Sequence, residues 1–284
     1  MLQKETHVGP FAAAVLQAVP TLEGLQVAEC REEVSAVLAP KDAEEVALVR
    51  KATDCVAYLM ESHFIKKLEG VVDADTKQTN RGLCSEMEEL MDGKDLQKRL
   101  SEKFGVDLNE LELVYTSLQS GSSFELKPDV EPTTAVIPMN GTYLLSLGMK
   151  YAEYSSLISR TILVDPTPRQ KQAYLLALEV QQLVVGALKP GAAVKGVYLA
   201  AKSLVQSKCP ELLPSFPRSV GFVMGIEFKD TQLQVTERTE RTLEPGTVLC
   251  VSVGFAEQGG APWGIWVADT VVVPLAPGGE GGGE

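Results

Sequence analysis

The stretches Thr142-Tyr-Leu-Leu-Ser-Leu-Gly-Met-Lys-Tyr151 and Tyr154-Ser-Ser-Leu-Ile-Ser-Arg-Thr-Ile-Leu-Val164, in the middle of the chain, decide the fold. Both are rich in aliphatic, β-branched and aromatic residues, and the short gap between them is typical of two antiparallel strands joined by a tight turn. A second pair of such stretches lies at 247–257 and 263–273. The two hairpins suggest a weak internal duplication and predict a mostly antiparallel sheet.

Helical patterns surround these hairpins. Asp42-Ala-Glu-Glu45 is a capping-box signal, and Thr167 followed by Pro168 is a second signal for a helix start. Apolar residues with helical spacing follow both signals. The predicted helices span residues 42–68, 79–91, 95–104, 168–188 and 194–207.

The remaining segments complete the expected organisation. We predict a short helix over 8–19 and strands over 34–38, 113–118, 220–228 and 232–235. Residues 1–40 resemble the tail of a preceding lobe with its connector, and residues 41–274 form one lobe. The Gly- and Glu-rich residues 275–284 are expected to be a flexible linker.

Composition excludes several classes of protein. An apolar fraction of 45% is enough for a core, but no stretch is long enough to span a membrane, and no signal peptide is expected. The net charge of −12 argues against direct binding of nucleic acid, and 24 of the 38 acidic residues lie within 1–130. The five cysteines lack C-x-x-C spacing, which indicates free thiols in a reducing compartment such as the cytosol or nucleus rather than a zinc site.

The first hairpin carries a recognisable motif. Ser146-Leu-Gly148 followed by Tyr154–Thr161 resembles the hairpin of the pita-bread metallopeptidases, which include methionine aminopeptidase, aminopeptidase P and prolidase. Those enzymes carry Asp-x-Gly and Tyr-x-Ser-Asp-x-Thr-Arg-Thr, and the two Asp hold a pair of divalent metals that activate a water. The resemblance implies an α+β pita-bread lobe with a curved, mostly antiparallel sheet and helices on its outer face. Ser146 and Leu157 stand at the two Asp positions.

The other three ligand positions of that family are also changed. Gly221-Phe-Val-Met-Gly225 resembles the family's Gly-His-x-x-Gly, which places Phe222 at the metal-binding His. Ser252 and Ala268 stand at the two ligating Glu positions, and both histidines of the chain, His7 and His63, precede the whole β region. Because hard divalent cations need anionic oxygens or imidazole, the resemblance implies a degenerate cleft with no metal, no other cofactor and no catalytic residue.

Other catalytic sets have little support in the sequence. A metallopeptidase with displaced ligands would need Glu153, Glu227 and Asp269 to converge, but Asp269 neighbours a ligand position and should point to the opposite face of its strand. His63 is expected to be a half-buried or surface histidine of a helix. The glycines at 221 and 225 do not form a phosphate loop, because the Gly-Lys-Ser/Thr ending is missing.

A narrower resemblance covers residues 40–274. The segments 148–166, 220–228, 243–248 and 264–273 resemble the N-terminal domain of the large subunit of the FACT histone chaperone. This resemblance implies a nuclear, chromosome-associated module without enzymatic activity. Its complex handles core histones, contains an HMG-type small subunit and reorganises nucleosomes in transcription, replication and repair. No membrane is implied as a partner.

Two readings of the degenerate cleft stay open. It could grip a basic peptide such as a histone tail, with Lys229 and Glu227 as contacts, or it could be packed shut in a domain that serves as a spacer or docking surface. A third possibility places a basic replication or chromatin partner on the acidic helices of 42–110, which carry Glu86, Glu88 and Glu89.

Overall fold

The computed structural model describes residues 9–24, 28, 30–121, 123–230, 232–258 and 260–275. The expected Gly- and Glu-rich linker, apart from Leu275, lies outside these described residues. Within the described ranges, the helices are all too short or too polar to cross a membrane.

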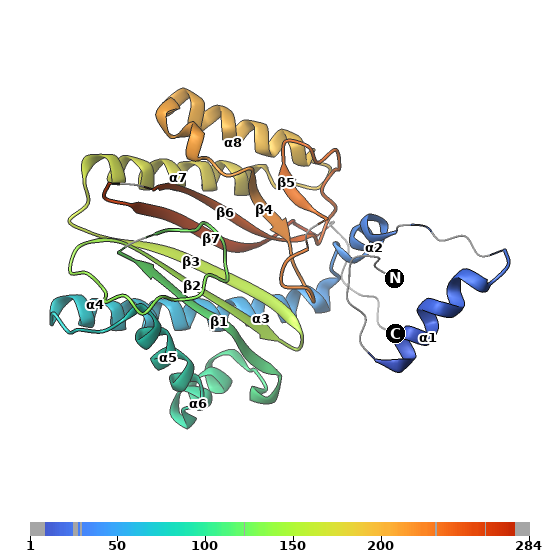
Figure 1. The fold of residues 1–284 in the computed structure, drawn as a ribbon, viewed down its shortest axis with the longest axis horizontal. Helices are drawn as coiled ribbons and strands as arrows, with labels where there is room; N and C mark the ends of the chain where they lie inside the picture. Colours follow the sequence, from blue (N-terminus) through green and yellow to red (C-terminus); the bar gives the residue numbers. More distant parts are fainter. Residues whose placement is uncertain are drawn as a thin grey trace.

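A single seven-stranded sheet forms the middle of the lobe, in the order β1-β2-β3-β7-β6-β4-β5 (Figure 1). Its pairs are antiparallel, and the two predicted hairpins are confirmed as β2–β3 and β6–β7. The hairpins meet between β3 and β7 through a short pairing, Ile158 with Asp269 and Ser159 with Ala268. The strands are β1 (Leu111–Ser120), β2 (Gly141–Tyr151), β3 (Tyr154–Val164), β4 (Ser219–Val223), β5 (Gln234–Thr236), β6 (Val248–Glu257) and β7 (Trp263–Val272).

Helices flank both halves of this sheet. In Figure 1, α7 lies beside β6 and β7, and α8 lies beside α7 and β5. On the other half of the sheet, α3 and α5 lie beside β1 to β3, and α6 packs on α3 and α5. The predicted helix over 42–68 is confirmed, but it continues to Asp73 through a π-helical turn at Met60–Phe64. The helices are α1 (Pro10–Ala18), α2 (Arg31–Leu38), α3 (Ala43–Leu59), α4 (Ile65–Asp73), α5 (Asn80–Met91), α6 (Lys94–Phe104), α7 (Pro168–Ala187) and α8 (Val194–Lys208).

Local signals fix the starts of the two longest helices. Asp42 accepts a hydrogen bond from the backbone N–H of Glu45 at 2.8 Å, and Glu45 accepts one from the N–H of Asp42 at 2.8 Å. Thr167 and Gln170 form the same reciprocal pair at the start of α7. Each box satisfies amides that a helix start would otherwise leave unpaired, and losing one costs about 1 kcal/mol.

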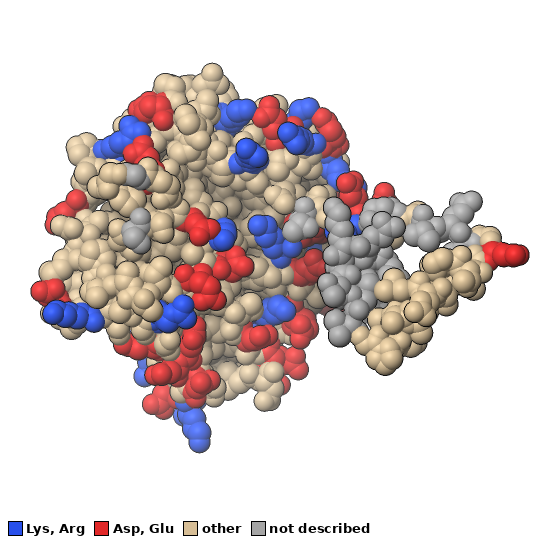
Figure 2. Space-filling model, in the orientation of Figure 1, with Lys and Arg blue, Asp and Glu red and all other residues tan. Residues whose placement is uncertain are grey.

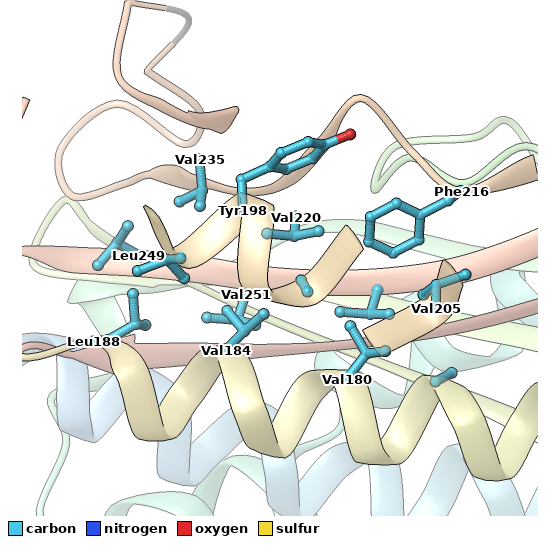
Figure 3. Packing of buried hydrophobic residues seen from close by; sticks show 14 of the residues in the cluster. Val180, Val184, Leu188, Tyr198, Val205, Phe216, Val220, Val235, Leu249 and Val251 are labelled. Carbon is cyan, nitrogen blue, oxygen red and sulfur yellow. The ribbon is translucent and has the colours of Figure 1, made fainter. Parts of the chain in front are cut away.

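Two apolar cores hold the helices on the outer face of the sheet. One core holds α7 and α8: Val184 of α7 lies next to Val251 of β6, and Tyr198 of α8 lies next to Val220 of β4 (Figure 3). A second core joins α3 to α6 with β1, β2 and β3. Because side chains alternate along a strand, the residues of β2, β3, β6 and β7 that do not face these helices form the opposite, inner face.

Two strand predictions are corrected. The segment 34–38, predicted as a strand, is the end of helix α2, because Glu32 and Glu33 in its first turn favour a helix start over the β preference of the valines. The strand predicted over 220–228 stops at Val223, since the chain turns there: the N–H of Gly225 bonds to the carbonyl of Glu227 at 3.0 Å.

Candidate functional site

The sheet brings the five degenerate ligand positions to neighbouring places on its inner face. Ser146, Leu157, Ser252 and Ala268 come from β2, β3, β6 and β7. Ser252 lies directly opposite Ala268, and both Ser146 and Ala268 lie opposite Ser159 on either side of β3. Phe222 of β4 lies opposite Cys250, which is two positions from Ser252 on β6. The residues that the resemblance assigns to the five ligand positions therefore lie close together on one face of the sheet, and none of them is a carboxylate or a histidine.

Neighbouring side chains bury most of these positions. Leu157 is 1% exposed, Ala268 0%, Ser146 2% and Phe222 5%, and Ser252 is half-buried. Leu157, Phe222 and Ala268 belong to one apolar cluster, which we call the inner-face cluster. Its other buried members are Val49, Phe124, Leu144, Met224, Val248, Cys250 and Trp266.

An aromatic pair covers one end of this cluster. The ring of Tyr115 stands edge-to-face on Phe228, with centroids 5.3 Å apart, and its hydroxyl group lies 3.0 Å from Oγ of Ser146. Burial raises the pKa of Tyr115 well above its usual value, so the phenol stays neutral. Both rings occupy the space over Gly148, where an added Cβ would overlap Tyr115 and come within 2.9 Å of Phe228.

A β-bulge explains why Tyr115 reaches the inner face. The register of β1 with β2 shifts between Leu113 and Tyr115, so Val114 has no partner of its own. Leu113 packs with the outer core, whereas Tyr115 packs with the inner-face cluster. An extra residue in one strand reverses the alternation beyond it, and single-sequence patterns do not reveal where this happens.

Phe124 closes the other end of the cluster. It lies in the segment after β1, is 3% exposed, and occupies the space above Gly264, where an added Cβ would lie 2.7 Å from the Cβ of Phe124. The amide of Gln258 donates to the carbonyl of Phe124 at 2.6 Å and anchors this segment to the end of β6. Sequence patterns do not identify Phe124, because its position depends on a long loop rather than on a periodic pattern.

The two candidate peptide contacts lie at the rim of the cluster. Lys229 and Glu227 are both exposed, in the segment that follows β4. The ammonium group of Lys229 lies 5.2 Å from the centroid of the Phe222 ring, a cation–π geometry. These side chains are accessible to a partner, whereas Phe222 beneath Lys229 is not.

The rival carboxylates do not converge. Asp269 faces α7, as its strand position predicts, and accepts hydrogen bonds from Arg160 at 2.7 Å and from Gln181 at 2.6 Å. Glu227 is exposed at the rim, and Glu153 lies in the turn between β2 and β3. Across the described part of the chain, no group of three or more His, Cys, Asp or Glu side chains could hold a metal ion.

His63 also lies away from the inner face. It belongs to the π-helical turn between α3 and α4 and stands edge-to-face on Tyr58, with ring centroids 5.6 Å apart. Burial, helped by the charges of Arg99, Lys66 and Lys67, lowers its pKa. This is the half-buried helix histidine that the sequence pattern predicts.

Comparisons with known proteins agree with this geometry. The profile of metallopeptidase family M24 matches residues 47–274. The FACT complex subunit SPT16 of Mycosarcoma maydis is 31% identical over 265 residues, which are 90% of this chain and 26% of that protein. The corresponding subunit of Oryza sativa subsp. japonica is 30% identical over 261 residues, 88% of this chain and 24% of that protein. The chain thus spans about a quarter of the length of these curated relatives.

Solved structures of related proteins have the same fold. The N-terminal domain of FACT complex subunit SPT16 from Eremothecium gossypii superposes with a TM-score of 0.88 at 28% identity, covering 95% of this chain and 65% of that one. A prolidase from Thermococcus sibiricus superposes with a TM-score of 0.70 at 19% identity, covering 92% of this chain and 65% of that one. The second likeness shows the fold alone.

Proposed function

Because the chain belongs to metallopeptidase family M24 and resembles the N-terminal domain of FACT subunits over most of its length, we propose that it is a catalytically inactive, peptidase-like module of a FACT large subunit. Residues 41–274 are the proposed peptidase-like lobe, and 1–40 belong to a connector and a preceding lobe. The proposed setting is the nucleus and chromosome, and the HMG-type subunit is a partner of the whole complex.

One observation carries the proposed inactivity. The five positions that the resemblance assigns to metal ligands lie close together, but they hold two serines, a leucine, a phenylalanine and an alanine. Four of them are buried, so neither cations nor a substrate carbonyl would have room. A two-metal mechanism needs several anionic ligands around an open, hydrated site, and the inner-face cluster provides the reverse.

A peptidase assay tests this inactivity. We expect the chain to show no turnover of dipeptides or X-Pro peptides with added Mn²⁺ or Co²⁺, under conditions in which a prolidase is active. Turnover that disappears in Glu227→Ala or Asp269→Ala, with the fold retained, would overturn the proposal and establish displaced ligands.

We further propose that the lobe binds core histones or other basic chromatin proteins through its surface rather than within the former cleft. The burial of Leu157, Phe222 and Ala268 supports a surface site, since a peptide could reach them only by displacing packed side chains. Lys229 and Glu227 at the rim remain proposed contacts. The acid excess suits a basic partner.

Titration with core histones tests the binding role. The H3–H4 complex and the complex of the other two core histones are each titrated against the chain at low and at physiological ionic strength, and binding that weakens with salt is expected. Absence of binding at concentrations of about tens of micromolar would remove the histone role and leave the second candidate, a spacer or docking surface for replication or chromatin partners. The closed cluster favours that second candidate equally well.

A further inference from the structure

A groove on the outside of the lobe, away from the former cleft, combines an apolar floor with carboxylate walls. Helix α5, helix α6, the turn before β1 and the first residues of β1 enclose about 330 Å³. Its apolar lining consists of Met91, Leu108, Leu111 and Leu113. All four are only half-buried, although they pack on the outer core of this half of the sheet.

Three exposed carboxylates line the same groove. Glu88 comes from α5, Asp92 from its C-terminal cap, and Glu112 from β1. Among the described residues, none of the three has an ion-pair or hydrogen-bond partner. Lys150 lies opposite Glu112 across the strands, but its ammonium group is directed to Glu153, 3.8 Å away. Figure 2 shows acidic side chains gathered over the region of α5 and α6.

Two other acidic side chains of these helices are paired within the protein. Glu86 forms an ion pair with Lys67 at 2.7 Å, and Glu102 with Lys98 at 3.8 Å. The charge on the groove walls is therefore left for a partner. An apolar floor with unpaired negative walls matches a cationic chain that carries an aliphatic side chain.

We propose that this groove binds a lysine- or arginine-rich protein segment that places one aliphatic side chain on Met91, Leu111 and Leu113 and its cations on Glu88, Asp92 and Glu112. The inference rests on the proposed role in binding basic chromatin proteins, and it assigns that role a location outside the degenerate cleft. An aliphatic anchor supplies affinity that survives salt, whereas the charge pairs supply orientation and association rate.

Matched variants of the full 284-residue chain separate the contribution of the groove to binding from that of net charge. The groove variant is Glu88→Gln/Asp92→Asn/Glu112→Gln. A control variant removes the same number of charges at exposed acids outside the groove: Glu61→Gln, Glu69→Gln and Asp73→Asn. All six sites are exposed, so both variants should keep the wild-type circular dichroism spectrum and melting temperature.

The probes are a synthetic Lys/Ser peptide with one central leucine, the same peptide with serine in place of leucine, and the H3–H4 complex, all measured by fluorescence anisotropy. We expect the groove variant to bind the leucine peptide and H3–H4 about tenfold more weakly at low ionic strength, and the control variant to lose less than about twofold. The serine peptide should bind the wild type about fivefold more weakly than the leucine peptide.

Several results would overturn the groove. Equal losses of affinity in the two variants would mean that net charge alone explains the binding. Equal affinity for the leucine and serine peptides would mean that the apolar floor does not contribute. If the groove variant binds H3–H4 as tightly as the wild type, the groove is refuted as the binding site, but the proposed function is not. If the wild type binds neither peptide nor H3–H4, both fail together. Self-association abolished by the groove variant would assign the groove to a second copy of the chain instead.

Discussion

Leu157→Asp restores the residue type of the catalytic relatives at one degenerate position and tests whether the inner face is closed. Leu157 is 1% exposed among apolar side chains of the inner-face cluster. Loss of its burial costs about 2–4 kcal/mol, and an unpaired polar group there costs about 1–3 kcal/mol more. A domain of this kind is stable by about 5–15 kcal/mol, so the variant should lie close to unfolding.

The pH dependence of that variant separates burial from simple loss of packing. Burial raises the pKa of an introduced carboxyl group in the folded state above about 3.9, its unfolded value. The extra destabilisation is then absent below about pH 4 and grows as the pH rises towards the folded-state pKa, at about 1.4 kcal/mol per pH unit. Leu157→Asn has nearly the same shape without this titration, so the difference between the two variants isolates the charge.

Urea unfolding, followed by circular dichroism and by tryptophan fluorescence, measures these stabilities. Trp266 lies in the same cluster and reports on its integrity. The reasoning is refuted if Leu157→Asp unfolds within about 1 kcal/mol of the wild type near pH 7, or if Mn²⁺ selectively stabilises it. Either result would mean that water or a cation reaches this position.

Three further predictions follow from other sites. Gly148→Ala should destabilise the lobe by about 1–3 kcal/mol in urea unfolding, because the new Cβ would overlap Tyr115; a neutral effect would contradict the covering aromatic pair. The lowered pKa of His63 means that protonation favours the unfolded state, so stability should fall as the pH drops below about 6.5, and His63→Gln should flatten that slope in thermal melts. Iodoacetamide labelling of the native chain, read by mass spectrometry, should modify the exposed Cys30 first, and rapid labelling of a buried thiol would contradict the structure. Burial protects the other four thiols: it raises the pKa of Cys55 and Cys84 to about 12 and that of Cys209 to about 11, and it also raises the pKa of Cys250 well above its ordinary value.

Features encoded by neighbouring residues could be predicted from the sequence. The hairpins and the two capping boxes depend on contacts within a few positions, and the structure has them where the patterns place them. The error at 34–38 is also local. Two valines favour a strand there, but a first turn with Glu32 and Glu33 is enough to support a short helix.

The composition of the inner-face cluster was harder to predict. The motifs identify Phe222 and Leu157 as substitutions at ligand positions, yet they do not say whether the space is filled. Filling depends on Tyr115, which a bulge turns inwards, and on Phe124, which a loop brings onto β7. Both arrangements rest on contacts between residues far apart in the sequence, and these have no periodic signature.

The closed inner face also makes it hard to introduce metal ligands one at a time. A carboxylate returned alone at position 157 or 268 would be buried among apolar neighbours and would cost stability at once. Binding of divalent cations would not compensate for this loss of stability until several ligands were present together, because a pair of metals needs a shared set of anionic groups. Each such single substitution would therefore lower stability before a metal could be bound. Surface positions carry no such constraint, so a lobe packed in this way can change its exposed side chains more readily than its inner face.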